Sequence, residues 1–258
     1  MDFIPTSIIK PCHSVFSPLI AHLANLSFRS GNSPTRFTAA QVTPLLNKPG
    51  LDKGDPSNYR PISNLNNISK ILKRLFLNRI RSHFISSPNF NPYQSAYLSH
   101  HSTETALILT IDSIYNSADL GKSTLLVSLD LSATFDIIDH SILLNRFTIS
   151  FGIDGPVLNW ISSYLSNRIQ FIQLGQSKSL ISPCTTGEPQ GSVYSWISLI
   201  HFIRLSCTSH CRLSQSISTA DDTQLFIALS RSNSETSVTS IQNALMSLYS
   251  WFSYNCLA

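Results

Sequence analysis

Apolar residues recur every three or four positions along several stretches of the chain, a spacing typical of amphipathic helices. Helices are predicted over residues 15–28, 66–82, 102–116, 139–147 and 154–165, with a last one from residue 232 onward. Polar residues that suit a helix start stand at Ser102, Asp139 and Asp154. Gly31, just past the first helix, is a typical stop.

Shorter runs between these helices predict strands. Residues 40–46 and 124–131 have strand character, and residues 169–174 alternate between apolar and polar side chains. Residues 175–177 favour a turn into a second strand that ends near Ser182. The chain therefore mixes helices with strands along its length.

The predicted helix at residues 66–82 carries the densest basic face in the chain. Its apolar stripe consists of Ile68, Ile71, Leu72, Leu75 and Ile80, and its outward residues are Lys70, Lys73, Arg74, Arg79 and Arg81. Such a face is usually just solvated, but it also suits contact with the backbone of a template or primer. Lys70, Lys73 and Arg74 are the candidate nucleic-acid-binding residues, and both interpretations stay open.

The composition of the chain neither demands nor excludes nucleic-acid binding by this basic face. The 258 residues are 42% hydrophobic, which is ordinary for a globular protein, but only 12% are charged. That charged fraction is about half of the usual ~25%. The net charge of +4 permits nucleic-acid binding without demanding it.

The five cysteines are odd in number and scattered, and no secretory signal precedes them. They are Cys12, Cys184, Cys207, Cys211 and Cys256. We expect reduced thiols in an intracellular protein, and no zinc site at Cys207 and Cys211, because no second pair stands at zinc spacing. Apolar runs stay well short of the ~20 residues that span a bilayer, so no membrane partner is expected.

Two groups of acidic residues stand beside predicted strands. The apolar run at residues 124–129 ends at Asp130, while Asp221 and Asp222 lie between a polar β-type run and the apolar residues 223–229. Carboxylates from separate strands can hold two divalent ions ~3.5–4 Å apart, which clamp the attacking and leaving oxygens of a phosphoryl displacement. Mg²⁺ is a hard ion that prefers such oxygen ligands.

Six motifs in a fixed order include these carboxylates. They are Asn58-Tyr59-Arg60-Pro61-Ile62-Ser63, Gln94-Ser95-Ala96-Tyr97, Ser102-Thr103-Glu104-Thr105-Ala106-Leu107, Leu129-Asp130-Leu131-Ser132-Ala133-Thr134-Phe135-Asp136, Pro189-Gln190-Gly191-Ser192-Val193 and Ala220-Asp221-Asp222. With this order and spacing, the chain from about Pro18 onward resembles the reverse transcriptase domain of LINE-type (non-LTR) retrotransposons.

The resemblance implies an α/β (α+β) fold: a right-hand polymerase palm, whose antiparallel sheet is backed by helices, with partial fingers. It also implies three parts, which are an N-terminal segment with one helix at residues 1–36, fingers at 37–122 and palm at 123–258. The family's thumb would follow the last residue, so a copy truncated before the thumb is expected. The endonuclease domain that such elements carry upstream is also expected to be missing.

The implied activity is RNA-directed DNA polymerase, a nucleotidyltransferase that joins a deoxynucleoside triphosphate to a primer 3′-hydroxyl by a two-metal mechanism. Asp130, Asp221 and Asp222 would be the catalytic residues and metal ligands, with the Leu131 carbonyl as a further ligand. Two Mg²⁺ ions are the implied cofactors, and Mn²⁺ is an alternative. The implied partners are an RNA template and a DNA primer, in the nucleus or cytoplasm.

The resemblance also implies which residues hold the substrates. Lys48 and Arg60 would contact the incoming triphosphate, and Arg60 is suited to this because Pro61 stiffens its backbone and guanidinium forms a good phosphate fork. Phe135 would act as a steric gate against the ribose 2′-hydroxyl. Gln190 and Gly191 would support the nascent base pair.

Two further interpretations stay open. The family usually has a small apolar residue where this chain has Glu188, and an aromatic one where it has Thr219. Together with the expected truncation, these departures favour a catalytically inactive palm remnant that acts as a nucleic-acid-binding or interaction module. A structural protein built on the amphipathic helices is the third interpretation, with an apolar patch available to a partner.

Overall fold

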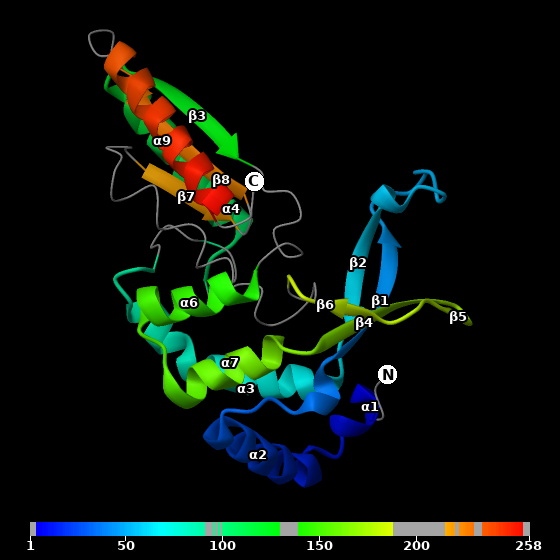
Figure 1. Cartoon of the computed structure of the whole chain (residues 1–258). Helices are drawn as coiled ribbons and strands as arrows, with labels where there is room; N and C mark the ends of the chain where they lie inside the picture. The colour runs from blue at the N-terminus through cyan, green and yellow to red at the C-terminus, as the bar shows by residue number, and fades with distance from the viewer. Residues whose placement is uncertain are drawn as a thin grey trace. The chain divides into compact units, whose positions relative to one another are not determined.

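The computed structural model describes residues 4–90, 95, 98, 100–129, 139–187, 215–219, 222–229 and 234–254 (Figure 1). The chain divides into two compact units, each built from two separate segments. Unit 1 comprises Met1–Ser86 with Ile138–Ser195, and unit 2 comprises Ser87–Ile137 with Trp196–Ala258. The predicted boundaries between the N-terminal segment, fingers and palm, after residues 36 and 122, differ from the limits of these units. They stay a prediction.

Unit 1 contains a mixed sheet with the strand order β2-β1-β4-β5, and β6 pairs with β4. The strands are β1 (Ala39–Leu46), β2 (Tyr59–Asn64), β4 (Arg168–Leu174), β5 (Ser177–Lys178) and β6 (Ser182–Cys184). Strands β1 and β2 form an antiparallel hairpin, whereas β1 and β4 are parallel. The strands predicted at residues 40–46 and 169–174 are thereby confirmed.

Unit 1 also contains helices (Figure 1). They are α1 (Thr6–Ile9), α2 (His13–Ser30), α3 (Asn67–Ser86), α6 (His140–Phe151) and α7 (Gly155–Leu165), with short 3₁₀ turns η1 (Thr35–Phe37) and η2 (Pro56–Asn58). Gly31 ends α2 in the left-handed conformation with φ 65°, as predicted. A Cβ atom at this position would lie 3.0 Å from the Asn159 Cβ atom, so glycine permits the close approach of α2 to α7.

Aromatic side chains from three helices form the core of the helical layer in unit 1. The Trp160 ring of α7 stacks on Phe76 of α3, with ring centroids 4.0 Å apart, and Phe28 of α2 meets both rings edge-on. Tyr164, one turn further along α7, stacks on Trp160 at 5.8 Å. The indole Nε1 donates to the Ser27 hydroxyl at 2.7 Å, which satisfies the one polar group of the buried ring.

The orientation predicted for Lys73 is wrong. Its side chain is 1% exposed, and its ammonium lies 4.4 Å from the centroid of the Tyr164 ring. The buried stripe of α3 is shifted from the predicted one and consists of Ser69, Leu72, Lys73, Phe76, Leu77, Ile80 and Phe84. The aliphatic stem of lysine packs like an apolar side chain and the ring face attracts the cation, so a basic residue can occupy this stripe.

Unit 2 contains a three-stranded antiparallel sheet with the order β3-β8-β7. Its elements are α4 (Thr103–Asp119), β3 (Ser123–Leu129), β7 (Gln215–Thr219), β8 (Asp222–Leu229) and α9 (Ser234–Tyr254). Helices α4 and α9 pack against this sheet (Figure 1). On the α4 side, Phe226 of β8 is buried with Ala106, and the Thr110 hydroxyl donates to the Gln224 side chain at 3.2 Å. This is the helix-backed antiparallel sheet predicted for the palm.

Two described cysteines are free thiols, Cys12 at the surface and the half-buried Cys184. Burial raises the pKa of the Cys184 thiol, and the nearby Arg168 guanidinium opposes that rise. Among the helices of the described ranges, none is both long and apolar enough to cross a membrane.

Candidate active site

The end of β3 and the start of β8 lie at one edge of the unit 2 sheet. The last residue of β3, Leu129, pairs with Thr223, and Asp222 is the preceding residue of β8. Asp130 directly follows Leu129 in the sequence but lies outside the described residues. The backbone pairing thus gives Asp222 a position beside the point where β3 ends.

Strands β7 and β8 pair at the same place. Thr219, the last residue of β7, pairs with Asp222, the first residue of β8. Asp221 and the predicted carbonyl ligand Leu131 lie outside the described residues.

The predicted donor set suits a hard divalent ion, because it consists of carboxylate and carbonyl oxygens alone. Asp222 lies next to the ends of both β3 and β7. This arrangement lets separate segments of the chain contribute ligands to one ion. Within the described part of the chain, no group of three His, Cys, Asp or Glu side chains could hold a metal ion. The complete set predicted here extends beyond that part through Asp130 and Asp221.

Lys48 and Arg60 belong to one hairpin of unit 1. Arg60 of β2 pairs with Leu45 of β1, and Lys48 follows the end of β1 in the connecting loop. The Asn47 amide donates to the Asn58 carbonyl at 2.8 Å, which closes the base of that loop. Both cationic side chains are exposed, so the two charges of the hairpin are accessible to a ligand.

The loop that connects β1 to β2 is held by its own side chains. The Asp55 carboxylate accepts from the Ser57 amide at 2.9 Å and caps the η2 turn. A hydrogen bond from the Ser57 side chain, and then the bond from its amide, lower the pKa of the Asp55 carboxyl. The Tyr59 hydroxyl donates to the Lys53 carbonyl at 3.1 Å, so the loop folds back on the start of β2.

The basic residues of α3 differ in how their side chains are placed. Arg74 is exposed and Lys70 is half-buried. The Arg79 guanidinium donates to the Asn25 side chain at 2.8 Å and lies 4.8 Å from the Phe28 ring centroid, so it contributes to packing against α2. With Lys73 buried, Lys70 and Arg74 are the members of the candidate set that remain accessible.

The structure shows a contact beside the predicted base-pair turn that the sequence analysis did not foresee. The His140 ring nitrogen Nε2 lies 2.7 Å from the Gly187 carbonyl oxygen, and Asp139 forms an isolated β-bridge with Thr186. A carbonyl only accepts, so Nε2 must carry the proton. The start of α6 therefore fixes the segment that leads toward Gln190.

Asp139 itself caps α6, as the sequence predicted. Its carboxylate accepts from the Ser141 hydroxyl and from the amides of Ser141 and Ile142. The hydroxyl bond is the main reason why the pKa of Asp139 is lowered. Phe135, Gln190 and Gly191 lie outside the described residues, as do the three cysteines beyond Cys184.

We expect the His140→Ala substitution to speed amide hydrogen exchange in residues 182–187. Loss of the bond to Gly187 should cost about 1 kcal/mol, which corresponds to roughly fivefold more frequent local opening. The His140→Gln variant keeps an N–H donor and serves as the control, with exchange close to that of the native chain. Equal exchange in the alanine variant and the native chain would show that the contact does not hold this segment.

Comparison with known protein families identifies one match over most of the chain. The model of the family "Reverse transcriptase (RNA-dependent DNA polymerase)" matches residues 46–254. A probable RNA-directed DNA polymerase from transposon BS of Drosophila melanogaster is 27% identical over 174 residues, which cover 67% of this chain and 19% of that protein. The Pol polyprotein from the type-1 retrotransposable element R2 of Popillia japonica is 29% identical over 175 residues, or 67% of this chain and 24% of that protein.

A third relative extends the match along the chain. The putative 115 kDa protein in the type-1 retrotransposable element R1DM of Drosophila melanogaster is 28% identical over 222 residues, which cover 84% of this chain and 21% of that protein. The chain thus spans about a fifth of the length of these curated relatives.

Among solved structures, the chain is similar to apo telomerase from Candida tropicalis truncated from its C-terminal domain. The TM-score is 0.53 and the sequence identity 12%, and the match covers 83% of this chain and 47% of the other. Such a likeness supports the fold. With the helix-backed antiparallel sheet of unit 2, it confirms the predicted palm-type α/β fold class.

Proposed function

Because the chain belongs to the reverse transcriptase (RNA-dependent DNA polymerase) family, as its motifs predicted, we propose that it performs RNA-templated DNA synthesis as the polymerase domain of a non-LTR retrotransposon. The reaction joins deoxynucleotides to a DNA primer whose template is RNA. The observation that carries the proposal is the family match over residues 46–254, which includes all three candidate carboxylates. The polymerase activity named for the longer relatives is thus proposed for this chain.

Asp130, Asp221 and Asp222, with the Leu131 carbonyl, would hold the divalent metal ions. Asp222 directly precedes Thr223, the partner of Leu129, and Asp130 directly follows Leu129 in the sequence, which supports a shared site. When bound, two Mg²⁺ ions lower the pKa of a primer hydroxyl and neutralise the leaving pyrophosphate. The carboxylates orient the ions and keep them at the sheet edge.

The remaining candidate residues would position the substrates. Lys48 and Arg60 would contact the triphosphate, and their common hairpin with exposed cationic side chains supports this role. Phe135 would exclude ribose, while Gln190 and Gly191 would support the new base pair. We further propose residues 1–36, 37–122 and 123–258 as N-terminal segment, fingers and palm.

The distribution of charge between the two units supports nucleic-acid binding by unit 1. Unit 1 carries 14 Lys and Arg residues against 6 Asp and Glu, a net charge of +8, whereas unit 2 carries 4 against 8, a net charge of −4. The overall +4 thus conceals a strongly basic unit. Phosphates of a nucleic acid would be drawn to unit 1, where Lys70 and Arg74 of α3 are candidates for backbone contacts.

The neighbouring residues Lys73 and Arg74 allow a matched test of this interface. We expect the Arg74→Met variant to bind a primer–template duplex a few-fold more weakly, with the slope of log affinity against log salt reduced by about 1. The Lys73→Met variant should keep both the native affinity and the native slope, because the Lys73 ammonium is buried. Fluorescence anisotropy titrations at several salt concentrations measure both quantities. An equal loss in the two variants would contradict this description of α3.

Primer extension tests the proposed function. The chain would be incubated with a DNA primer annealed to an RNA template, Mg²⁺ and four deoxynucleoside triphosphates. We expect template-length products that require the RNA template and that do not form when ribonucleoside triphosphates replace the deoxynucleotides. The absence of extension under all metal and salt conditions would overturn the proposal for this chain.

A second candidate function is that of an inactive palm remnant that binds nucleic acid without extending a primer. Thr219 favours it, because the family usually has an aromatic residue there and Thr219 pairs directly with Asp222. Salt-sensitive duplex binding without any extension would support this candidate. Extension in the assay described above would exclude it.

A further inference from the structure

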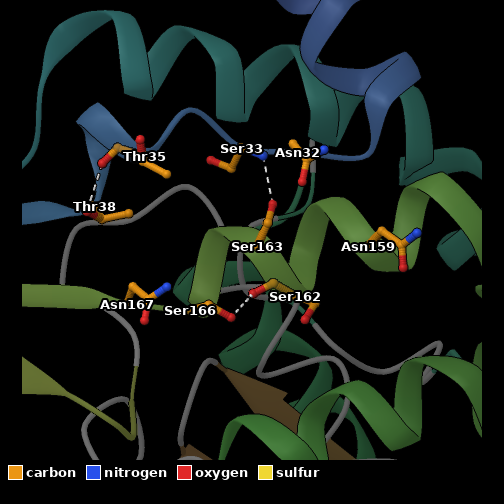
Figure 2. Close-up of a pocket in the computed structure, with 9 residues that line it drawn as sticks. All are labelled: Asn32, Ser33, Thr35, Thr38, Asn159, Ser162, Ser163, Ser166 and Asn167. Carbon is orange, nitrogen blue, oxygen red and sulfur yellow. Dashed lines mark hydrogen bonds between the residues drawn. The ribbon is translucent and has the colours of Figure 1, made fainter.

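A pocket of about 460 Å³ lies in unit 1, between the segment that follows α2 and one face of α7 (Figure 2). It is lined by Asn32, Ser33, Thr35, Thr38, Asn159, Ser162, Ser163, Ser166 and Asn167. Every lining side chain is a hydroxyl or an amide, so the pocket carries many hydrogen-bonding groups and no formal charge. Its volume falls within the usual range of ligand sites, about 300–1,000 Å³.

Hydrogen bonds connect the two walls of the pocket to each other and to the residues beneath them. The Ser33 amide donates to the Ser163 hydroxyl at 2.7 Å, which joins one wall to the other (Figure 2). Beneath them, the Ser27 hydroxyl accepts from Trp160 and donates to the Asn32 carbonyl at 2.5 Å. A site with rigid walls loses little conformational entropy on binding, which favours affinity.

Two lining amides remain available to a ligand. Asn159 and Asn167 are exposed, and neither hydrogen-bonds another lining residue, whereas Ser33 bonds Ser163 and Ser166 bonds Ser162 (Figure 2). Asn167 has the left-handed backbone conformation with φ 53°, a conformation that clusters at functional positions. Each side-chain amide offers both a hydrogen-bond donor and an acceptor, so it can bind a planar ligand group whose edge carries an acceptor and a donor.

The hydroxyl and amide side chains of the lining determine which part of a ligand the pocket can bind. Neutral hydroxyls and amides suit ribose hydroxyls and the edge of a base, but they cannot offset the charge of a phosphate. Arg36 is an exposed cation that directly follows the lining residue Thr35 in η1, so it is the candidate to supply that charge. A neutral pocket beside a cation in a basic unit therefore fits one nucleotide of a longer strand.

We propose that this pocket binds one unpaired ribonucleotide of an RNA strand, with the ribose 2′-hydroxyl and the base edge in the pocket and a phosphate at Arg36. The proposal rests on the proposed function, because it assumes that the chain binds RNA. Unpaired nucleotides expose the edges and the 2′-hydroxyl through which proteins distinguish RNA from DNA. The pocket thereby contributes selectivity for RNA in a unit whose net charge attracts either nucleic acid.

Equilibrium binding of three matched oligonucleotides tests this proposal. Fluorescently labelled single strands of one sequence, made of RNA, DNA and 2′-O-methyl RNA, would be titrated with the native chain and with the Asn159→Ala/Asn167→Gly double variant. Glycine keeps the backbone conformation of residue 167 accessible. We expect the native chain to bind RNA about tenfold more tightly than DNA or 2′-O-methyl RNA, as expected for one or two hydrogen bonds.

The variants decide between the outcomes. In the double variant the preference for RNA should disappear while DNA affinity stays the same, and the isosteric Asn159→Asp variant should weaken RNA binding as well. The Asn145→Ala control, at an exposed position of α6, should behave as the native chain does. A preference for RNA that persists in the double variant would overturn the pocket and leave the proposed function standing. Failure to bind any of the strands would overturn both.

Discussion

We expect the Asp222→Asn substitution to reduce RNA-templated primer extension by roughly a thousandfold or more. A metal ion contributes several kcal/mol to the stabilisation of transition-state charge, and each 1.4 kcal/mol corresponds to about a factor of ten in rate. Asparagine keeps the size of the side chain but removes the negative charge that would hold the ion. The measurement is the initial rate of extension with saturating primer–template and deoxynucleotides.

The Asp119→Asn variant is the control for this loss. It makes the same change of charge in unit 2, at an exposed residue near the end of α4. Its extension rate should stay within about twofold of the native rate, because exposed charges far from a site contribute little. Comparable rates for Asp222→Asn and the native chain would remove Asp222 from the catalytic set.

The second large effect concerns folding stability. We expect the Trp160→Ala substitution to lower the free energy of unfolding by about 3–5 kcal/mol, the usual cost of removing a large buried aromatic side chain. The Trp160 ring is 1% exposed and stacks between Phe76 and Tyr164. Urea unfolding followed by far-ultraviolet circular dichroism measures the change.

The Trp160→Phe variant separates ring packing from hydrogen bonding. It keeps an aromatic body but leaves the Ser27 hydroxyl without its indole donor, so the loss should be smaller, about 1–2 kcal/mol. A loss below about 1 kcal/mol in the alanine variant would mean that the aromatic layer of α2, α3 and α7 does not stabilise unit 1.

Local patterns predicted the helices well where the apolar stripe is regular. In α7, which lies within the helix predicted at residues 154–165, Trp160, Ile161, Tyr164 and Leu165 of the apolar stripe are buried, and Val157 is half-buried. The stripe of α3 was misplaced because Lys73 and Ser69 do not count as apolar in a periodicity argument. The aromatic ring that accepts the Lys73 ammonium comes from α7, about ninety residues away, so no local pattern could reveal it.

Contacts between distant segments could not be predicted from the sequence. The parallel pairing of β1 with β4 joins Ala39–Val42 to Ile169–Ile172, and neither strand carries a signal that names its partner. The bond between His140 and Gly187 has the same non-local character. The only available signal was a histidine directly after the helix cap Asp139, and this position does not show whether the ring is solvated or bonded.

The strands that flank the candidate carboxylates were easier to anticipate than their pairing, because their signals are local. An apolar run that stops at a carboxylate predicted the end of β3, and the acidic pair predicted the turn before β8. That these two ends meet in one antiparallel pair is a finding of the structure. The roles of Lys48, Arg60, Phe135, Gln190 and Gly191 stay predictions, since they follow from the family resemblance rather than from local physics.

The central claim is that Asp130, Asp221 and Asp222 bind one metal centre at the edge of the unit 2 sheet. Iron-directed cleavage tests it without requiring catalysis: Fe²⁺ occupies sites built from carboxylates, and with ascorbate and peroxide it generates radicals that cut the nearby backbone. We predict cuts in two separate segments, near residue 130 and near residues 221–222, both suppressed by excess Mg²⁺ and lost together in the Asp222→Asn variant. Cleavage at only one of these segments, or cuts that Mg²⁺ does not suppress, would contradict a shared site.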